Sequence, residues 1–137
     1  MSHDSHPLVM VVDDESAIVR LAARVLEPAG YRVLTATSGP EAIRIVEGLD
    51  GPVALLLTDL EMPEMTGRSL ALELRKSQLG LKVLYLTGHA DELFGFSTLL
   101  EPHEAFVEKP ISGPALLEAV ALHLFGTLQA PSEPPAK

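Results

Sequence analysis

The chain has 137 residues, of which 47% are hydrophobic and 21% charged, and its formal net charge is −9. This length and composition are typical of a single globular domain with a packed core and exclude an intrinsically disordered chain. The negative charge opposes contact with a phosphate backbone, so we expect no direct binding of nucleic acid. The absence of cysteine excludes disulfides, thiolate catalysis and sulfur-bound metal.

Neither a membrane span nor a secretory signal is visible in the sequence. The longest apolar runs, such as those starting at Leu8 and Val53, are far shorter than the roughly 20 residues that cross a bilayer. The first residues lack a basic start followed by an apolar stretch. We therefore expect a cytoplasmic protein with an N-terminal extension over 1–7, one domain over 8–128, and a Pro-rich disordered tail over 129–137.

Five short runs rich in β-branched residues or Leu alternate with five longer segments of helical periodicity. These runs predict strands over Leu8–Val12, Arg32–Ala36, Val53–Thr58, Lys82–Leu86 and Ala105–Val107. The alternation predicts the α/β class, with a doubly wound, five-stranded parallel sheet that helices cover on both faces.

Three helices are predicted before the fourth strand. The first begins near Ser16, which we expect to cap it, and the others follow Ser38 and Thr66. Their expected buried positions are Ile18, Leu21, Ala22, Val25 and Leu26 in the first, Ala42, Ile43 and Val46 in the second, and Leu70, Leu72 and Leu74 in the third.

Two further helices are predicted on either side of the fifth strand. One lies within 91–100, where Gly95 weakens it, and the other runs from Ser112 to about Leu128. The expected core stripe of the last helix is Leu117, Ala121, Leu124 and Leu128. Leu116, Val120 and Phe125 lie partly off that stripe, either as an apolar patch for a partner or as scattered surface residues.

Polar residues follow the predicted strands at the points where a parallel α/β sheet places its ligand site. The acidic pair Asp13 and Asp14 follows the first strand, Asp59 the third, Thr87 the fourth and Lys109 the fifth. Gathered carboxylates repel one another unless a cation compensates, and Mg²⁺ prefers such oxygen ligands. A carboxylate between Mg²⁺ and an ammonium is suited to attack phosphorus, because both cations neutralise the transferring oxygens.

Four stretches, "VVDDES", "LLLTDLEMPEMTG", "VLYLTGHA" and "AFVEKPIS", resemble the receiver domain of bacterial two-component response regulators. The resemblance covers the chain from Leu8 to about Leu128 and implies the flavodoxin-like (βα)5 receiver fold. It also implies that Asp59 accepts a phosphoryl group from a phosphohistidine on a sensor histidine kinase or a histidine phosphotransfer protein.

The same resemblance implies roles for residues around Asp59. Mg²⁺ would be held by Asp13, Asp14, Asp59 and the backbone carbonyl of Glu61. Thr87 and Lys109 would contact the phosphoryl oxygens, and the Lys109–Pro110 bond would be cis.

A switch of conformation is the implied consequence of phosphorylation. Phe106 would turn inward as the Thr87 hydroxyl moves toward the phosphoryl group, remodelling the face of helix four, strand five and helix five. That face would bind an unknown downstream protein and could form a homodimer. Glu61 and His89 flank the site and either influence the lifetime of the phosphoryl group or are simply exposed to solvent.

Two other classes of protein are alternatives to a receiver, which would be a signalling phosphoacceptor and not an enzyme. A small Mg²⁺-dependent aspartyl-phosphate phosphatase of the haloacid dehalogenase type needs Asp-x-Asp on the first strand, whereas Asp59 ends the third. A flavodoxin-like nucleotide binder needs a phosphate loop where "DDES" would repel phosphate. The sequence leaves open whether the chain is a stand-alone regulator or the receiver of a hybrid sensor kinase.

Overall fold

A computed structural model of the chain describes residues 6–88 and 103–126. Five parallel strands form one sheet in the order β2-β1-β3-β4-β5. The strands are β1 (Leu8–Val12), β2 (Arg32–Ala36), β3 (Leu55–Asp59), β4 (Lys82–Thr87) and β5 (Glu104–Glu108). The predicted doubly wound parallel sheet is confirmed.

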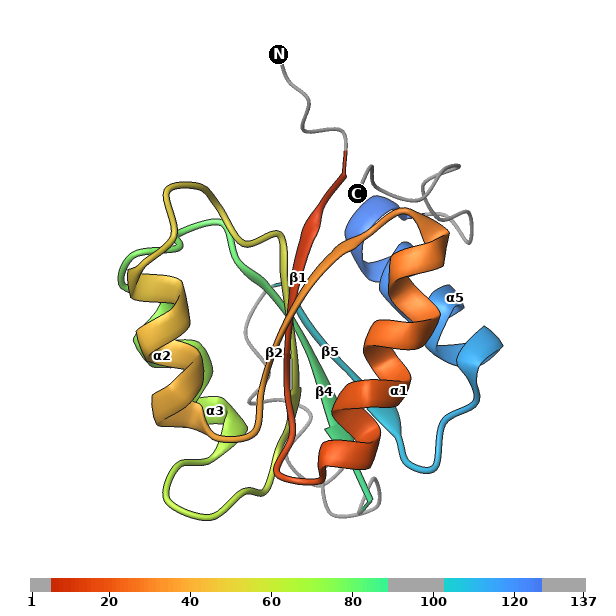
Figure 1. Cartoon of the computed structure of the whole chain (residues 1–137), viewed down its shortest axis with the longest axis horizontal. Helices are drawn as coiled ribbons and strands as arrows, with labels where there is room; N and C mark the ends of the chain where they lie inside the picture. Colours follow the sequence, from red (N-terminus) through yellow and green to blue (C-terminus); the bar gives the residue numbers. More distant parts are fainter. Residues whose placement is uncertain (1–5, 89–102, 127–137) are drawn as a thin grey trace.

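Helices cover both faces of this sheet, with α2 and α3 on one side and α1 and α5 on the other (Figure 1). The described helices are α1 (Ser16–Leu26), the short 3₁₀ helix η1 (Glu27–Ala29), α2 (Gly39–Glu47), α3 (Gly67–Arg75) and α5 (Gly113–Phe125). The helix predicted within 91–100 lies outside the described residues. None of the helices in the described ranges is both long and apolar enough to span a membrane.

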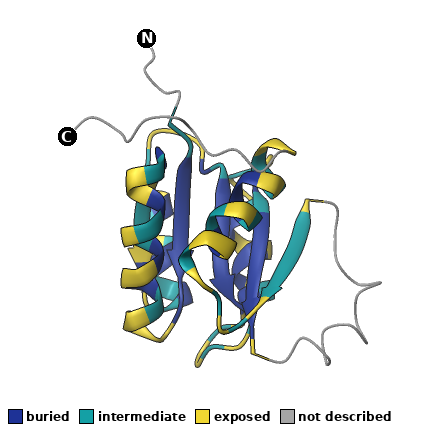
Figure 2. Ribbon diagram, turned by 90° about the vertical axis from the view of Figure 1, so that its right-hand side faces the viewer, coloured by how far each residue is buried: buried dark blue, intermediate teal, exposed yellow. Residues whose placement is uncertain are grey.

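The apolar strands of the sheet separate two hydrophobic cores. Alternate residues of β1 point to opposite faces, so Met10 joins the core under α2 and α3 while Val9 and Val11 join the core under α1 and α5. Every residue of β1 and β3 is buried, whereas β5 at the sheet edge is only half-buried (Figure 2). The continuous apolar runs in the sequence are therefore the central strands.

Three of the four described α-helices begin with a side-chain cap. The hydroxyls of Ser38, Thr66 and Ser112 accept hydrogen bonds from backbone N–H groups in the first turns of α2, α3 and α5. Helix α1 differs, because its N-cap is Glu15 and no side chain caps it. The prediction that Ser16 caps α1 is wrong, since Ser16 is already the first helical residue.

The buried faces of two helices differ from the predicted ones. In α1 the buried residues are Val19, Ala22 and Leu26, while Leu21 is 37% exposed, because the stripe follows a spacing of three and four residues from Val19. In α3, Leu70 and Leu74 are buried as predicted, but Leu72 points to solvent and is 65% exposed.

The inner face of α5 agrees with the predicted stripe only in part: Ala121 is buried as predicted, and Leu128 lies outside the described residues. The buried residues of α5 are Leu116, Val120 and Ala121, whereas Leu117 and Leu124 are only half-buried. The helix is apolar on most of its circumference, so periodicity could not identify the inner face. It also ends earlier than Leu128, because Gly126 takes a left-handed conformation with φ of 72° that stops the helix after Phe125.

A buried ionic cluster, not foreseen in the sequence, fixes the start of β5. The Glu104 side chain is 3% exposed and accepts hydrogen bonds from Arg75 Nη1 and the Tyr85 hydroxyl, both at 3.0 Å. The Arg75 guanidinium also donates to the Leu81 carbonyl at 3.4 Å. The end of α3, the middle of β4 and the edge strand β5 are thereby held together.

Leu70→Ala and Leu72→Ala compare two leucines of the same helix, one with no exposed surface and one that is 65% exposed. We expect Leu70→Ala to lower the free energy of unfolding by about 3 kcal/mol through lost burial and a residual cavity. Leu72→Ala should change it by less than about 0.5 kcal/mol. Urea denaturation measures both, and equal losses would contradict the assigned inner face of α3.

Candidate functional site

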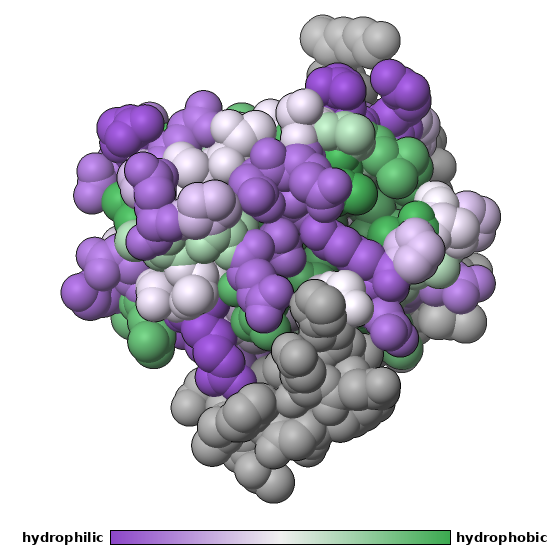
Figure 3. Space-filling view, turned by 90° about the horizontal axis from the view of Figure 1, so that it is seen from below, coloured by the Kyte–Doolittle hydropathy of each residue, from purple (hydrophilic) through white to green (hydrophobic). Residues whose placement is uncertain are grey.

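The carboxyl ends of the five parallel strands meet at one edge of the sheet, and polar residues gather there. Figure 3 views the molecule from this edge and shows hydrophilic residues in a band across the centre of the face. β3 ends at Asp59 and β4 at Thr87, each one residue later than predicted, because both residues still take part in the ladder. Asp59 and Thr87 are therefore part of the sheet itself.

Three carboxylates lie together at this edge. Asp13 has no exposed surface and Asp59 is 8% exposed, whereas Asp14 is exposed. Their carboxylate oxygens lie within 4.8 Å of one another. The ends of β1 and β3 thus bring the three acids to one edge of the sheet. A set of ligands made only of oxygen fits a hard divalent cation, so this group could hold a metal ion such as Mg²⁺.

The ammonium of Lys109 lies among these carboxylates. Its Nζ atom is 2.9 Å from Asp13 Oδ2, 3.3 Å from Glu15 Oε1 and 3.5 Å from Asp59 Oδ2. The backbone fixes this placement, because the Lys109 N–H donates to the Thr87 carbonyl at 2.7 Å. The following bond to Pro110 is cis, as the resemblance to receivers implied.

Thr87 is 2% exposed at the end of β4, beside the end of β3. Asp59 pairs with Leu86 in the ladder, so Thr87 lies one residue beyond the partner of Asp59. The Leu60 N–H also donates to the Leu86 carbonyl at 3.0 Å, which keeps the chain leaving β3 against β4. The sheet thus brings Thr87 to the same edge as the carboxylates.

The loop after Asp59 folds back closely onto the strand end. Gly67 donates its N–H to the Leu60 carbonyl at 2.9 Å, and a Cβ at this position would overlap the Asp59 carbonyl oxygen. Only glycine permits this approach. The Glu61 N–H lies 3.4 Å from Asp59 Oδ1, so this backbone also contacts the central carboxylate.

Burial and neighbouring charges change the proton affinity of the site. Burial, reinforced by the charge of Asp13, raises the pKa of Asp59 from 3.8 to about 6, although Lys109 opposes the shift. Burial also raises the pKa of Asp13, against the Glu15 N–H and Lys109. Burial alone would lower the pKa of Lys109, but its carboxylate partners outweigh that effect and raise it. The site therefore favours a bound cation or proton.

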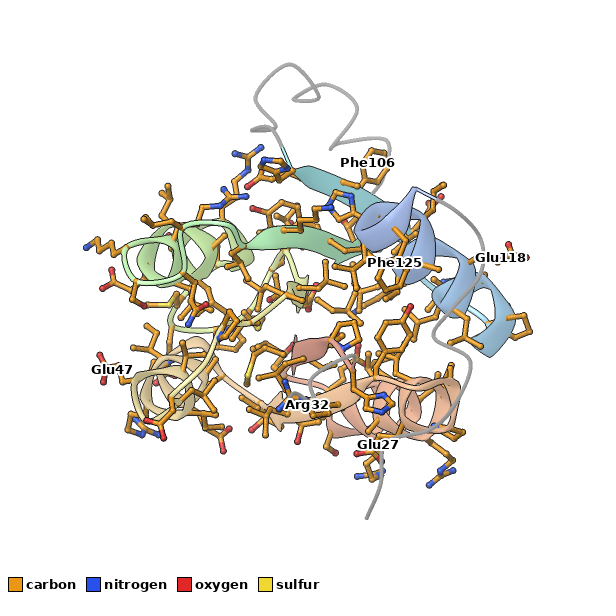
Figure 4. All side chains as sticks on the ribbon, turned by 90° about the horizontal axis from the view of Figure 1, so that it is seen from above. Glu27, Arg32, Glu47, Phe106, Glu118 and Phe125 are labelled. Atoms are coloured by element: carbon orange, nitrogen blue, oxygen red, sulfur yellow. The ribbon has the colours of Figure 1, made fainter. Side chains whose placement is uncertain are left out.

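The remaining predicted residues lie around this centre or beyond the described ranges. Phe106 is half-buried on β5, packs against the core under α2 and α3, and lies at the edge of the sheet in Figure 4. The Glu61 side chain is exposed, and His89 lies outside the described residues. Sequence reasoning missed the contact of Glu15 with Lys109, for which the only signal was a third acid after the first strand.

Comparison with known proteins assigns the chain to a family. The model of the family described as "Response regulator receiver domain" matches residues 9–121. The chain belongs to this family of two-component signalling domains, in which a phosphoacceptor role is general. The predicted membership is confirmed.

Curated relatives share the domain but are much longer. The chain is 38% identical to the sensor kinase CckA of Brucella abortus over 76% of its own length and 11% of that protein. It is 34% identical to the transcriptional regulatory protein GlrR of Escherichia coli, over 88% of this chain and 26% of GlrR. The response regulator SaeR of Staphylococcus aureus is 33% identical over 76% of this chain and 44% of SaeR.

Solved receiver structures align with this chain over nearly their whole length. The receiver domain of the hybrid histidine kinase CckA aligns with a TM-score of 0.73 and 32% identity, covering 85% of this chain and 98% of that one. A response regulator receiver domain from Clostridium thermocellum aligns with a TM-score of 0.74 and 30% identity, covering 86% and 94%. These matches confirm the receiver fold.

The raised pKa of Asp59 makes stability depend on pH. Between about pH 4 and 6, Asp59 binds more protons in the folded protein than in the unfolded chain. The stability that protonated Asp59 contributes is therefore fully present below about pH 4 and is lost as the pH rises to about 6. We expect Asp59→Asn to stabilise the metal-free protein at pH 7 by about 1–3 kcal/mol. Below about pH 4 the difference should vanish, because wild-type Asp59 is then neutral in both states.

Urea denaturation across pH, with EDTA present, measures this difference. Asp50→Asn is the matched control, because Asp50 is exposed at the opposite end of the sheet. The control should change stability little at any pH. A less stable Asp59→Asn variant at pH 7 would contradict the net repulsion inferred at the site.

Proposed function

We propose that Asp59 is the phosphoacceptor of this receiver and takes its phosphoryl group from a phosphohistidine. The donor would be a sensor histidine kinase or a histidine phosphotransfer protein. The observation that supports this best is the buried Asp59 carboxylate at the end of β3, with Lys109 Nζ at 3.5 Å and two further carboxylates beside it. Membership of the receiver family supports the same role.

Mg²⁺ is the proposed cofactor, held by Asp13, Asp14, Asp59 and the backbone carbonyl of Glu61. When bound, it would neutralise charge on the transferring phosphoryl oxygens. The three clustered carboxylates support this assignment, since without a cation they repel one another.

Three side chains of this site would act directly in the transfer of the phosphoryl group. Asp59 supplies the carboxylate oxygen that forms the new bond to phosphorus, while the phosphohistidine nitrogen leaves. Lys109 supplies a positive charge beside that oxygen, and Thr87 can donate its hydroxyl to a phosphoryl oxygen. The strand backbone holds both residues, which favours reaction because little reorganisation is needed.

The output is proposed to be a change in the face that includes β5 and α5. Phe106 would turn inward as Thr87 moves toward the phosphoryl group, and the altered face would bind a downstream protein or a second copy of the chain. The edge strand β5, which carries Phe106, supports this proposal because it is more exposed than the central strands and pairs with a strand on one side only.

The chain is proposed to act as a signalling phosphoacceptor, with at most self-catalysed phosphorylation and dephosphorylation. Asp59 ends β3 and not the first strand, which disfavours a phosphatase of the haloacid dehalogenase type. Glu61 and His89 stay candidates for control of phosphoryl lifetime.

Incubation with acetyl phosphate and Mg²⁺ tests the acceptor. We expect wild type and the control Asp50→Asn to gain one phosphoryl group that hydroxylamine removes, as an acyl phosphate requires. Asp59→Asn should gain none, and EDTA should abolish labelling of the wild type. Intact-mass spectrometry measures the uptake, and a label of equal size on Asp59→Asn would sink the assignment.

A further inference from the structure

The Lys109 ammonium has a carboxylate partner outside the proposed metal ligands. Glu15 Oε1 lies 3.3 Å from Lys109 Nζ, closer than Asp59 Oδ2 at 3.5 Å. We infer that Glu15 is a positioning residue, which holds Lys109 toward Asp13 while Asp59 is unmodified and so tunes the phosphorylation rate. This inference rests on the proposed function, because it concerns the use of Lys109 at the same site.

Hydrogen bonds hold both the N–H and the carbonyl of Glu15, so the position of its Cα, from which the side chain extends, is well defined. Its N–H donates to Asp13 Oδ1 at 2.9 Å. Its carbonyl accepts hydrogen bonds from the N–H groups of Ile18 and Val19, at 3.0 and 3.3 Å, in the first turn of α1. One residue therefore orients Asp13 through its amide and contacts Lys109 through its carboxylate.

The start of α1 provides an independent argument. Glu15 occupies the N-cap position but makes no capping hydrogen bond with its side chain, whereas α2, α3 and α5 each begin with a capping Ser or Thr. A Ser, Thr, Asp or Asn side chain at this position would accept a hydrogen bond from a backbone N–H in the first turn of α1. The carboxylate of Glu15 contacts the Lys109 ammonium instead, which indicates a role at the site and not in helix stability.

The three distances predict a competition for Lys109. Its Nζ atom lies 2.9 Å from Asp13 Oδ2, so Asp13 and Glu15 together draw the ammonium to the β1 side. A phosphoryl group on Asp59 requires the ammonium on the β3 side. The Glu15 side chain is 65% exposed, so solvent and salt screen its attraction for the Lys109 ammonium. Glu15 therefore has a modest effect on the rate of phosphorylation of Asp59.

The first experiment uses protein without Mg²⁺ or phosphodonor. The chain has four lysines, so the side-chain ammonium signal of Lys109 can be resolved by NMR in ¹⁵N-lysine-labelled protein. We expect Glu15→Gln to shift the Lys109 Nζ signal and the Asp59 Cγ signal, because the ammonium moves toward Asp59. Glu108→Gln is the matched control, since Glu108 is exposed, precedes Lys109 and loses the same charge; it should shift neither signal comparably.

The second experiment measures labelling by acetyl phosphate with Mg²⁺. Glu15→Gln should be phosphorylated about two- to fivefold faster than wild type, the range expected for loss of an exposed ion pair. The gain should shrink at high salt. Glu108→Gln should keep the wild-type rate.

A further variant separates the contact from the stability of α1. Glu15→Ser introduces a capping hydroxyl, so we expect its Tm to rise while the Lys109 and Asp59 signals shift as in Glu15→Gln. If both Glu15 variants leave these signals and the rate unchanged while wild type is labelled on Asp59, the inference about Glu15 is wrong and the proposed function stands. If wild type takes up no label, the proposed function fails, and the metal-free spectra still decide whether Glu15 holds Lys109.

Discussion

The arrangement of the site depends on one ionic interaction, the Lys109 ammonium between the buried carboxylates of Asp13 and Asp59. Two carboxylates with so little exposed surface are costly in the charged form unless a cation lies close by. Lys109 compensates only in part, because burial and Asp13 still raise the pKa of Asp59 to about 6. The unmodified site is thus left with excess negative charge, and this is the physical basis of its proposed affinity for a divalent cation.

The parallel sheet makes this interaction possible. Asp13 follows β1, Asp59 ends β3 and Lys109 follows β5, so residues far apart in the chain reach one edge. Central strands buried on both faces form a rigid base, and the close approach of Gly67 fixes the loop beyond Asp59. The edge strand β5 is less buried. The site therefore joins an acceptor on a fully buried strand to a lysine that follows the more exposed edge strand.

Much of the fold and site could be predicted from local patterns. The strands β1 and β2 were predicted residue for residue, since short runs rich in Leu and β-branched residues define them clearly. The juxtaposition of Asp13, Asp14 and Asp59 followed from the rule that parallel strands share an edge. The inner face of α5 was predicted only in part, because a helix that is apolar on most sides carries little periodic signal. Its inner face depends on what the sheet and α1 present to it.

The α/β class, the parallel sheet and the residues at the strand ends can be read from the sequence alone, because the periodicity of each segment and the alternation of strands with helices are visible along the chain. Which carboxylates Lys109 contacts, Glu15 among them, depends on the packed structure. So does the burial of Glu104 between Arg75 and Tyr85. Such contacts join residues distant in the chain, and their geometry depends on the packing of whole elements, which no local pattern records.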